Sequence, residues 1–179
     1  AKNTMRVIAD HIKASTFLIL DGVVPSNKLQ GYVLRRLLRR SAIKMRNLSG
    51  ELNVNLFASM IRIIEAQHDG LFGMDKNSQS GLVQKVVSDE MEKFSKTLDR
   101  GLKEVEKIEK IDGKLAFNLY QTFGFPYEVT KEIFKDKGQE IDRDQFKAEF
   151  EKHQELSRTS SSGMFKGGLA GHSEVEIKY

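Results

Sequence analysis

One apolar repeat constrains the fold more than any other feature of the chain. Between Leu82 and Lys110, apolar residues recur every three or four positions, and the residues between them are Glu, Lys, Asp and Arg. This spacing predicts a long α-helix with one apolar face, either as a solvated helix or as an antiparallel arm. Gly101 is the weak point of this helix. The chain contains only two prolines, Pro25 and Pro126, so long helices are also permitted elsewhere.

The same three-to-four spacing predicts further helices over residues 4–20, 31–46, 53–67, 113–123 and 141–158. In the third of these we expect four residues to face inward: Leu56, Met60, Ile63 and Ile64. Several residues are suited to helix ends: Ser26 and Asn27 before the basic helix, Gly124 after residues 113–123, Pro126 at the first position of the next helix, and Asp142 or Asp144 before the last.

These elements predict an all-α protein, a helical bundle with a long helical arm. We expect one helical domain over residues 1–158. After Arg158 the sequence becomes rich in Ser and Gly, which predicts a flexible linker over residues 159–179.

Composition limits the possible chemistry. The chain has no cysteine, which excludes disulfides and thiolate metal sites and is compatible with a reducing compartment. The four histidines lack ligand spacing, and no apolar run approaches the roughly 20 residues of a membrane span. The acid pairs Asp89–Glu90 and Glu104–Glu106 are interpreted as solvated charges on an outer helix face. We therefore predict no catalytic residues, metal ligands, cofactor or membrane partner, and interpret the chain as a helical binding module.

The stretch "GYVLRRLLRRSAIKMR" at residues 31–46 is the most basic part of the chain. Arg35 and Arg39 are four residues apart, as are Arg36 and Arg40, so they form two rows beside an apolar stripe. Like charges at this spacing repel by roughly 0.2–0.5 kcal/mol per pair, so an anionic partner is expected. The arginines could face phosphate, or their stems could cover the core edge while acidic helices neutralise them.

Positive charge is concentrated at the beginning of the chain. Residues 1–47 contain 10 Lys and Arg but only 2 Asp, a net charge of +8, whereas the remainder has 19 basic and 23 acidic residues. Such a concentration is typical of nucleic-acid binding and is also compatible with an acidic protein partner.

Three blocks of sequence resemble the alanyl-tRNA synthetases, in that family's order: "RVIADHIKASTFLILDGVVPSNKLQGYVLRRLLRR" (6–40), "FNLYQTFGFPYEVT" (117–130) and "FKGGLAGHSE" (165–174). The resemblance implies the helical tRNA-recognition segment between the class II catalytic domain and the editing domain. It also implies that the parent enzyme is a cytoplasmic alanine–tRNA ligase of protein biosynthesis. That enzyme would use ATP, Mg and Zn outside this segment, which alone should be inactive.

The resemblance also implies a partner and a site. The family recognises the tRNA(Ala) acceptor stem through a G·U wobble at its third base pair. The family's asparagine matches Asn27, and an aspartate of its "YDTYGFP" motif is replaced by Gln121 in "YQTFGFP". Arg35, Arg36, Arg39 and Arg40 would contact the RNA backbone, with Arg39 as the closest match to a family arginine tied to tRNA recognition. The alternatives are a helical protein-interaction module and a non-specific RNA-binding bundle.

Overall fold

The computed structural model describes residues 2–68 and 81–166, with side chains as far as Ser157. These residues form seven α-helices and no strand, which confirms the predicted all-α class. The helices are α1 (Lys2–Leu20), α2 (Leu29–Ser49), α3 (Val54–Gln67), α4 (Leu82–Lys107), α5 (Gly113–Phe123), α6 (Tyr127–Asp136) and α7 (Arg143–Lys166).

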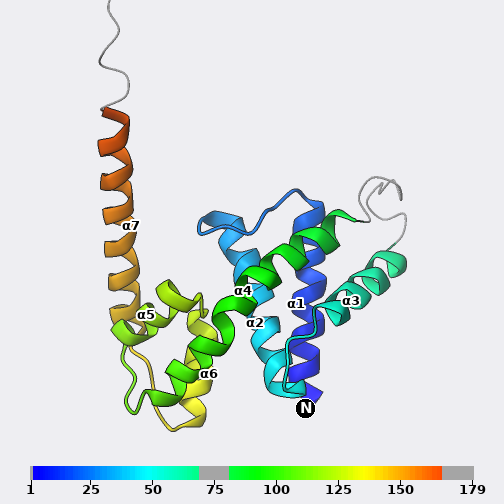
Figure 1. Ribbon diagram of the computed structural model, residues 1–179, viewed down its shortest axis with the longest axis horizontal. Coiled ribbons are helices and arrows are strands. Elements are labelled where there is room, and N and C mark those ends of the chain that lie inside the picture. Colours follow the sequence, from blue (N-terminus) through cyan, green and yellow to red (C-terminus); the bar gives the residue numbers. More distant parts are fainter. Residues whose placement is uncertain (1, 69–80, 167–179) are drawn as a thin grey trace, which may run out of the picture.

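Helix α4 is the element that connects the two ends of the molecule (Figure 1). It packs against α1, α2 and α3 over its first part and against α5 further along, while α6 and α7 pack on α5. Its buried apolar residues are Val83, Val87, Met91, Phe94, Leu98 and Val105. The long helix predicted from the apolar repeat is therefore present, but it runs through the core instead of forming a separate solvated arm.

Gly101 is a point of close approach within α4. A Cβ atom at this position would lie 2.9 Å from Cβ of Phe123 and would overlap the ring of Phe125. Phe125 is fully buried and also packs its ring edge against Phe94, with 6.1 Å between ring centroids. The glycine that weakens the helix locally thus allows the segment after α5 to pack against it.

Helix α7 ends later than the sequence predicts. Asp142 caps its start, because Oδ1 accepts from the backbone N of Asp144 at 2.9 Å and of Gln145 at 3.0 Å. The helix then continues past Arg158 to Lys166, so the linker does not begin at residue 159. Serine is only moderately unfavourable in a helix, and each added residue gains a hydrogen bond once a helix is formed. The rest of the predicted linker, residues 167–179, lies outside the described residues. In Figure 1 the C-terminal half of α7 projects away from the other helices.

Two expectations about individual residues are wrong. In α3 the buried residues are Phe57, Ile61 and Ile64, whereas Leu56 is 47% exposed and Ile63 57% exposed. The apolar face is rotated because Phe57, the largest apolar residue of the segment, occupies the core.

The predicted helix ends are partly correct. Neither Ser26 nor Asn27 caps α2: the cap residue is Lys28, and no side chain caps the helix. Gly124 ends α5 in the left-handed conformation, with φ 74°, and Asp142 is the expected cap of α7. Pro126 lies one residue earlier than predicted, at the cap of α6 instead of its first position. Among residues 2–68 and 81–166, no helix has both the length and the apolar character needed to cross a membrane.

Candidate nucleic-acid interface

Helix α2 carries the basic rows on a buried framework. Its apolar stripe is anchored by residues that include Leu34, Leu38 and Met45, all buried against α1 and α4. The arginines leave the helix beside this stripe, so their stems lie over the edge of the core while their guanidinium groups reach neighbouring helices.

Acidic residues of α6 neutralise one of the two basic rows. Arg36 Nη1 donates to Glu128 Oε1 at 2.8 Å. Glu132 forms ion pairs with Arg40 and with Lys44, whose Nζ lies 2.5 Å from Oε2. Burial alone would raise the pKa of Glu132, but its bonds from Lys44 and Arg40 outweigh that effect and leave the pKa below its ordinary value. The carboxylates of α6 thus supply part of the negative charge that the basic helix requires.

Glu90 of α4 is the partner of the other row. Its Oε1 lies 2.7 Å from Arg39 Nε and 3.3 Å from Arg35 Nε, and the residue is only 3% exposed. The expectation that Glu90 is a solvated surface charge is therefore wrong. The burial of Glu90 could not be predicted from its position next to Met91 on α4, because its two partners belong to a helix that is distant in sequence.

Arg35 and Arg39 also bind the loops on either side of the site. Arg35 Nη1 donates to Oδ1 of Asn27, and its Nη2 donates to the carbonyl of Pro25 at 3.4 Å. Arg39 Nη1 donates to the carbonyl of Gly124 at 3.1 Å, and its guanidinium lies 4.9 Å from the centre of the Phe94 ring. If the arginine stems cover the core edge, acidic helices are expected to neutralise the guanidinium groups, and these ion pairs are present.

One groove contains four of the six predicted RNA-binding residues. This groove has a volume of about 680 Å³ and is lined by Asn27, Arg35, Arg39 and Gln121. These residues are far apart in sequence, because they belong to the loop before α2, to α2 and to α5. The sequence did not predict the other polar residues that line the groove, notably Lys28, Lys93, Thr97, His153 and Gln154. Lys28 is adjacent to Asn27 in the chain and could have been suspected, whereas Lys93 is brought close only by the packing of α4.

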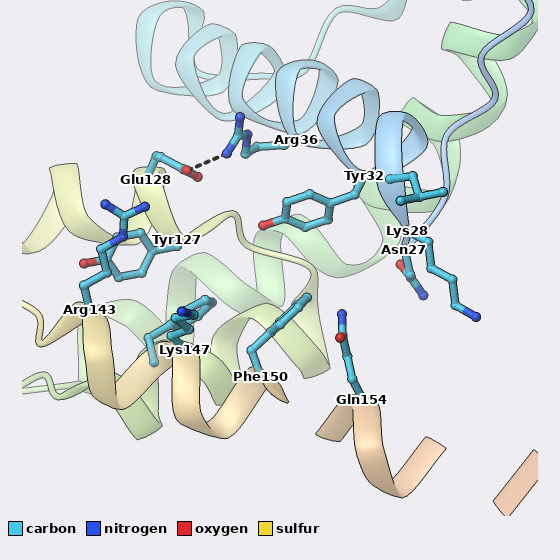
Figure 2. A pocket seen from close by; sticks show the side chains of 12 residues that line it. Asn27, Lys28, Tyr32, Arg36, Tyr127, Glu128, Arg143, Lys147, Phe150 and Gln154 are labelled. Carbon is cyan, nitrogen blue, oxygen red and sulfur yellow. Dashed lines mark hydrogen bonds and ion pairs between the residues drawn. The ribbon is translucent and has the colours of Figure 1, made fainter. Parts of the chain in front are cut away.

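A second hollow of about 580 Å³ adjoins this groove, because Asn27, Lys28, Phe150 and Gln154 line both. Figure 2 shows the Arg36–Glu128 ion pair at one end, with Tyr32 and Phe150 between it and Asn27. Burial raises the pKa of Tyr32 to about 12, so its hydroxyl keeps its proton at neutral pH. The structure thus places Arg36 beside this hollow and not in the groove.

Arg40 lies in neither hollow. Besides Glu132 it contacts His11 of α1, with 3.1 Å between Nη1 and Nε2. Burial and the charge of Arg40 lower the pKa of His11 below 6.5, more than Asp10 and Glu132 raise it. Within the described residues, no group of three or more His, Cys, Asp or Glu side chains is placed to hold a metal ion.

The pKa of His11 predicts a pH dependence of stability. When the folded-state pKa lies below the unfolded value, the unfolded state binds more protons between the two values, so stability rises with pH there. The free energy of unfolding should therefore fall as the pH is lowered through about 6.5, the unfolded value, towards the lower pKa of the folded state. His11→Gln, which does not titrate, should flatten this part of the profile in denaturant titrations. An identical slope in both proteins would contradict the assignment.

Comparison with known proteins agrees with the sequence resemblance. The family model described as tRNA synthetases class II (A) matches residues 1–176. The chain belongs to this family. Among its relatives are the alanine–tRNA ligases of Borreliella afzelii, 40% identical over 97% of this chain, and Fusobacterium nucleatum, 36% identical over 92%. That of Treponema pallidum is 35% identical over 98%.

This class II synthetase chain is much shorter than its relatives. It spans 30% of the length of the Borreliella and Treponema ligases and 20% of the Fusobacterium ligase.

Proposed function

We propose that this chain is the tRNA acceptor-stem recognition part of an alanine–tRNA ligase, the enzyme that joins alanine to its tRNA with ATP. The observation that carries the proposal is the groove that brings Asn27 and Gln121 together with Arg35 and Arg39. The names of the relatives support the amino acid, and the 20–30% share of their length supports a recognition part within a longer enzyme.

The groove has the chemistry needed to recognise a wobble pair. A G·U pair leaves the guanine 2-amino group without a partner in the minor groove, which in RNA is wide and shallow enough for short side chains. Asn27 and Gln121 each offer an amide oxygen as acceptor. Asn27 is exposed, and its Oδ1 keeps a second lone pair after accepting from Arg35.

The positive charge around the groove would bind the RNA backbone. Glu90 carries one negative charge and contacts two arginines, so Glu90, Arg35 and Arg39 together keep one net positive charge. Lys28 and Lys93 add two more at the groove wall. We place the backbone contacts at Arg35 and Arg39, with Arg36 at the adjoining hollow. Arg40 would first have to leave Glu132 and His11.

The remaining chemistry belongs to the parent enzyme in this proposal. ATP and Mg would bind in its class II catalytic domain, alanine would reach this chain only as part of the reaction there, and Zn would belong to the editing domain. The cytoplasm is the compartment in which such an enzyme would meet its tRNA.

Binding of an acceptor-stem duplex at increasing salt tests the proposal. Contacts to several phosphates predict a steep loss of affinity between low and moderate salt, because binding releases counterions. A helical protein-interaction module would not bind the duplex in this salt-dependent way, and that result would overturn the proposal. A non-specific RNA-binding bundle would show the salt dependence but bind duplexes with G·U and G·C at the third pair equally.

A further inference from the structure

Glu90 is the only charged residue among the buried polar residues of the described chain. Removing a carboxylate from water is costly unless cations and hydrogen bonds compensate. Here the compensation comes from two arginines one helical turn apart, Arg35 and Arg39. One oxygen, Oε1, accepts a hydrogen bond from Arg39 at 2.7 Å and forms an ion pair with Arg35 at 3.3 Å, so both guanidinium groups are drawn to the same carboxylate.

Each arginine in turn holds one wall of the groove. Arg35 donates to the amide oxygen of Asn27, in the loop before α2. Arg39 donates to the carbonyl of Gly124, the residue that ends α5, and α5 carries Gln121. A continuous chain of contacts therefore runs from one proposed recognition residue, through Glu90, to the end of the helix that carries the other. Its links are hydrogen bonds from Arg35 to Asn27, from Arg39 to Glu90 and from Arg39 to Gly124, and an ion pair between Arg35 and Glu90.

We infer that Glu90 is a positioning residue for RNA recognition, an inference that rests on the proposed function. Asn27 is exposed, and its amide group would rotate freely without Arg35. Glu90 orients Arg35, which points Oδ1 of Asn27 in one direction, and it orients Arg39, which fixes the end of α5. Glu90 itself does not line the groove and need not touch the RNA.

The test uses the full-length ligase that contains this sequence. Its readout is the ratio of kcat/KM for acceptor-stem duplexes with G·U and with G·C at the third pair. Glu90→Gln should lower this ratio about tenfold, the effect of losing one discriminating hydrogen bond. Glu132→Gln is the matched control, because Glu132 also receives two cations of α2 but is not linked to Asn27 or Gly124. It should leave the ratio unchanged.

A second substitution shows whether Glu90 acts through Asn27. In an Asn27→Ala enzyme, Glu90→Gln should lower the ratio much less than in the native enzyme, because the amide that it positions is gone. Equal effects in both backgrounds would overturn the role of Glu90 in positioning Asn27. If Glu90→Gln prevents folding, Arg35→Lys takes its place. It keeps the charge but lacks the planar guanidinium whose Nε faces Glu90 while Nη1 donates to Asn27. A native ratio in this variant would overturn the inference.

The same measurements separate this inference from the proposed function. If Asn27→Ala and Gln121→Ala both leave the ratio at its native value, the groove does not read the third pair and the proposed function fails. If they lower the ratio while Glu90→Gln and Arg35→Lys do not, only the positioning role of Glu90 fails.

Discussion

Replacing Gly124 with alanine should lower the free energy of unfolding by about 3 kcal/mol, the sum of a left-handed backbone and an overpacked site. Gly124 has φ 74°, a conformation that side chains disfavour. An added Cβ would also overlap Nη1 of Arg39 and lie 2.9 Å from its Cζ. The substitution would therefore displace the guanidinium that binds both Glu90 and the Gly124 carbonyl.

Gly138 provides a control for the backbone alone. It has the same φ of 74°, but no atom lies within 4 Å of an added Cβ. Gly138→Ala should cost only about 1 kcal/mol. Urea titrations of both variants measure the difference, and equal losses would contradict the close packing of Arg39 against Gly124.

Arg39→Ala should have an effect of similar size, about 3 kcal/mol, because it removes one partner of a buried carboxylate. Glu90 would keep only Arg35 at 3.3 Å, and the carbonyl of Gly124 would lose its donor. Arg46→Ala is a suitable control. Arg46 pairs with the exposed Asp99 at 3.4 Å, and such surface pairs contribute about 0–1 kcal/mol.

Binding to an acceptor-stem duplex shows whether Arg39 also neutralises a phosphate. In that case the slope of log affinity against log salt should fall by about one unit in Arg39→Ala, measured where the variant remains folded. A native slope combined with lower stability would instead assign Arg39 a purely structural role.

The apolar repeats predict six of the seven helices, whereas α6 was expected only from Pro126 as the start of a helix. Gly124 and Asp142 could be predicted as helix ends because a cap depends on residues a few positions away. The end of α7 was missed since Ser- and Gly-rich composition does not by itself stop a helix that has already formed.

The site was harder to predict because it depends on pairs that are distant in sequence. Asn27 and Gln121 were predicted from the resemblance alone, and both line one groove. Glu90 was missed, because a carboxylate beside an apolar residue on a helix appears exposed unless its partners are known. Its partners, Arg35 and Arg39, belong to a helix that packs against α4 only in the folded protein.

The most direct test of the account is aminoacylation of acceptor-stem duplexes by the full-length ligase with Gln, Asp or Ala at position 121. A carboxylate facing the guanine amino group would make a charge-assisted hydrogen bond, roughly twice as strong as that of a neutral amide. Gln121→Asp should therefore increase the preference for G·U over G·C at the third pair, and Gln121→Ala should reduce it. The same preference in all three enzymes would contradict the account, because it would remove Gln121 from the recognition site.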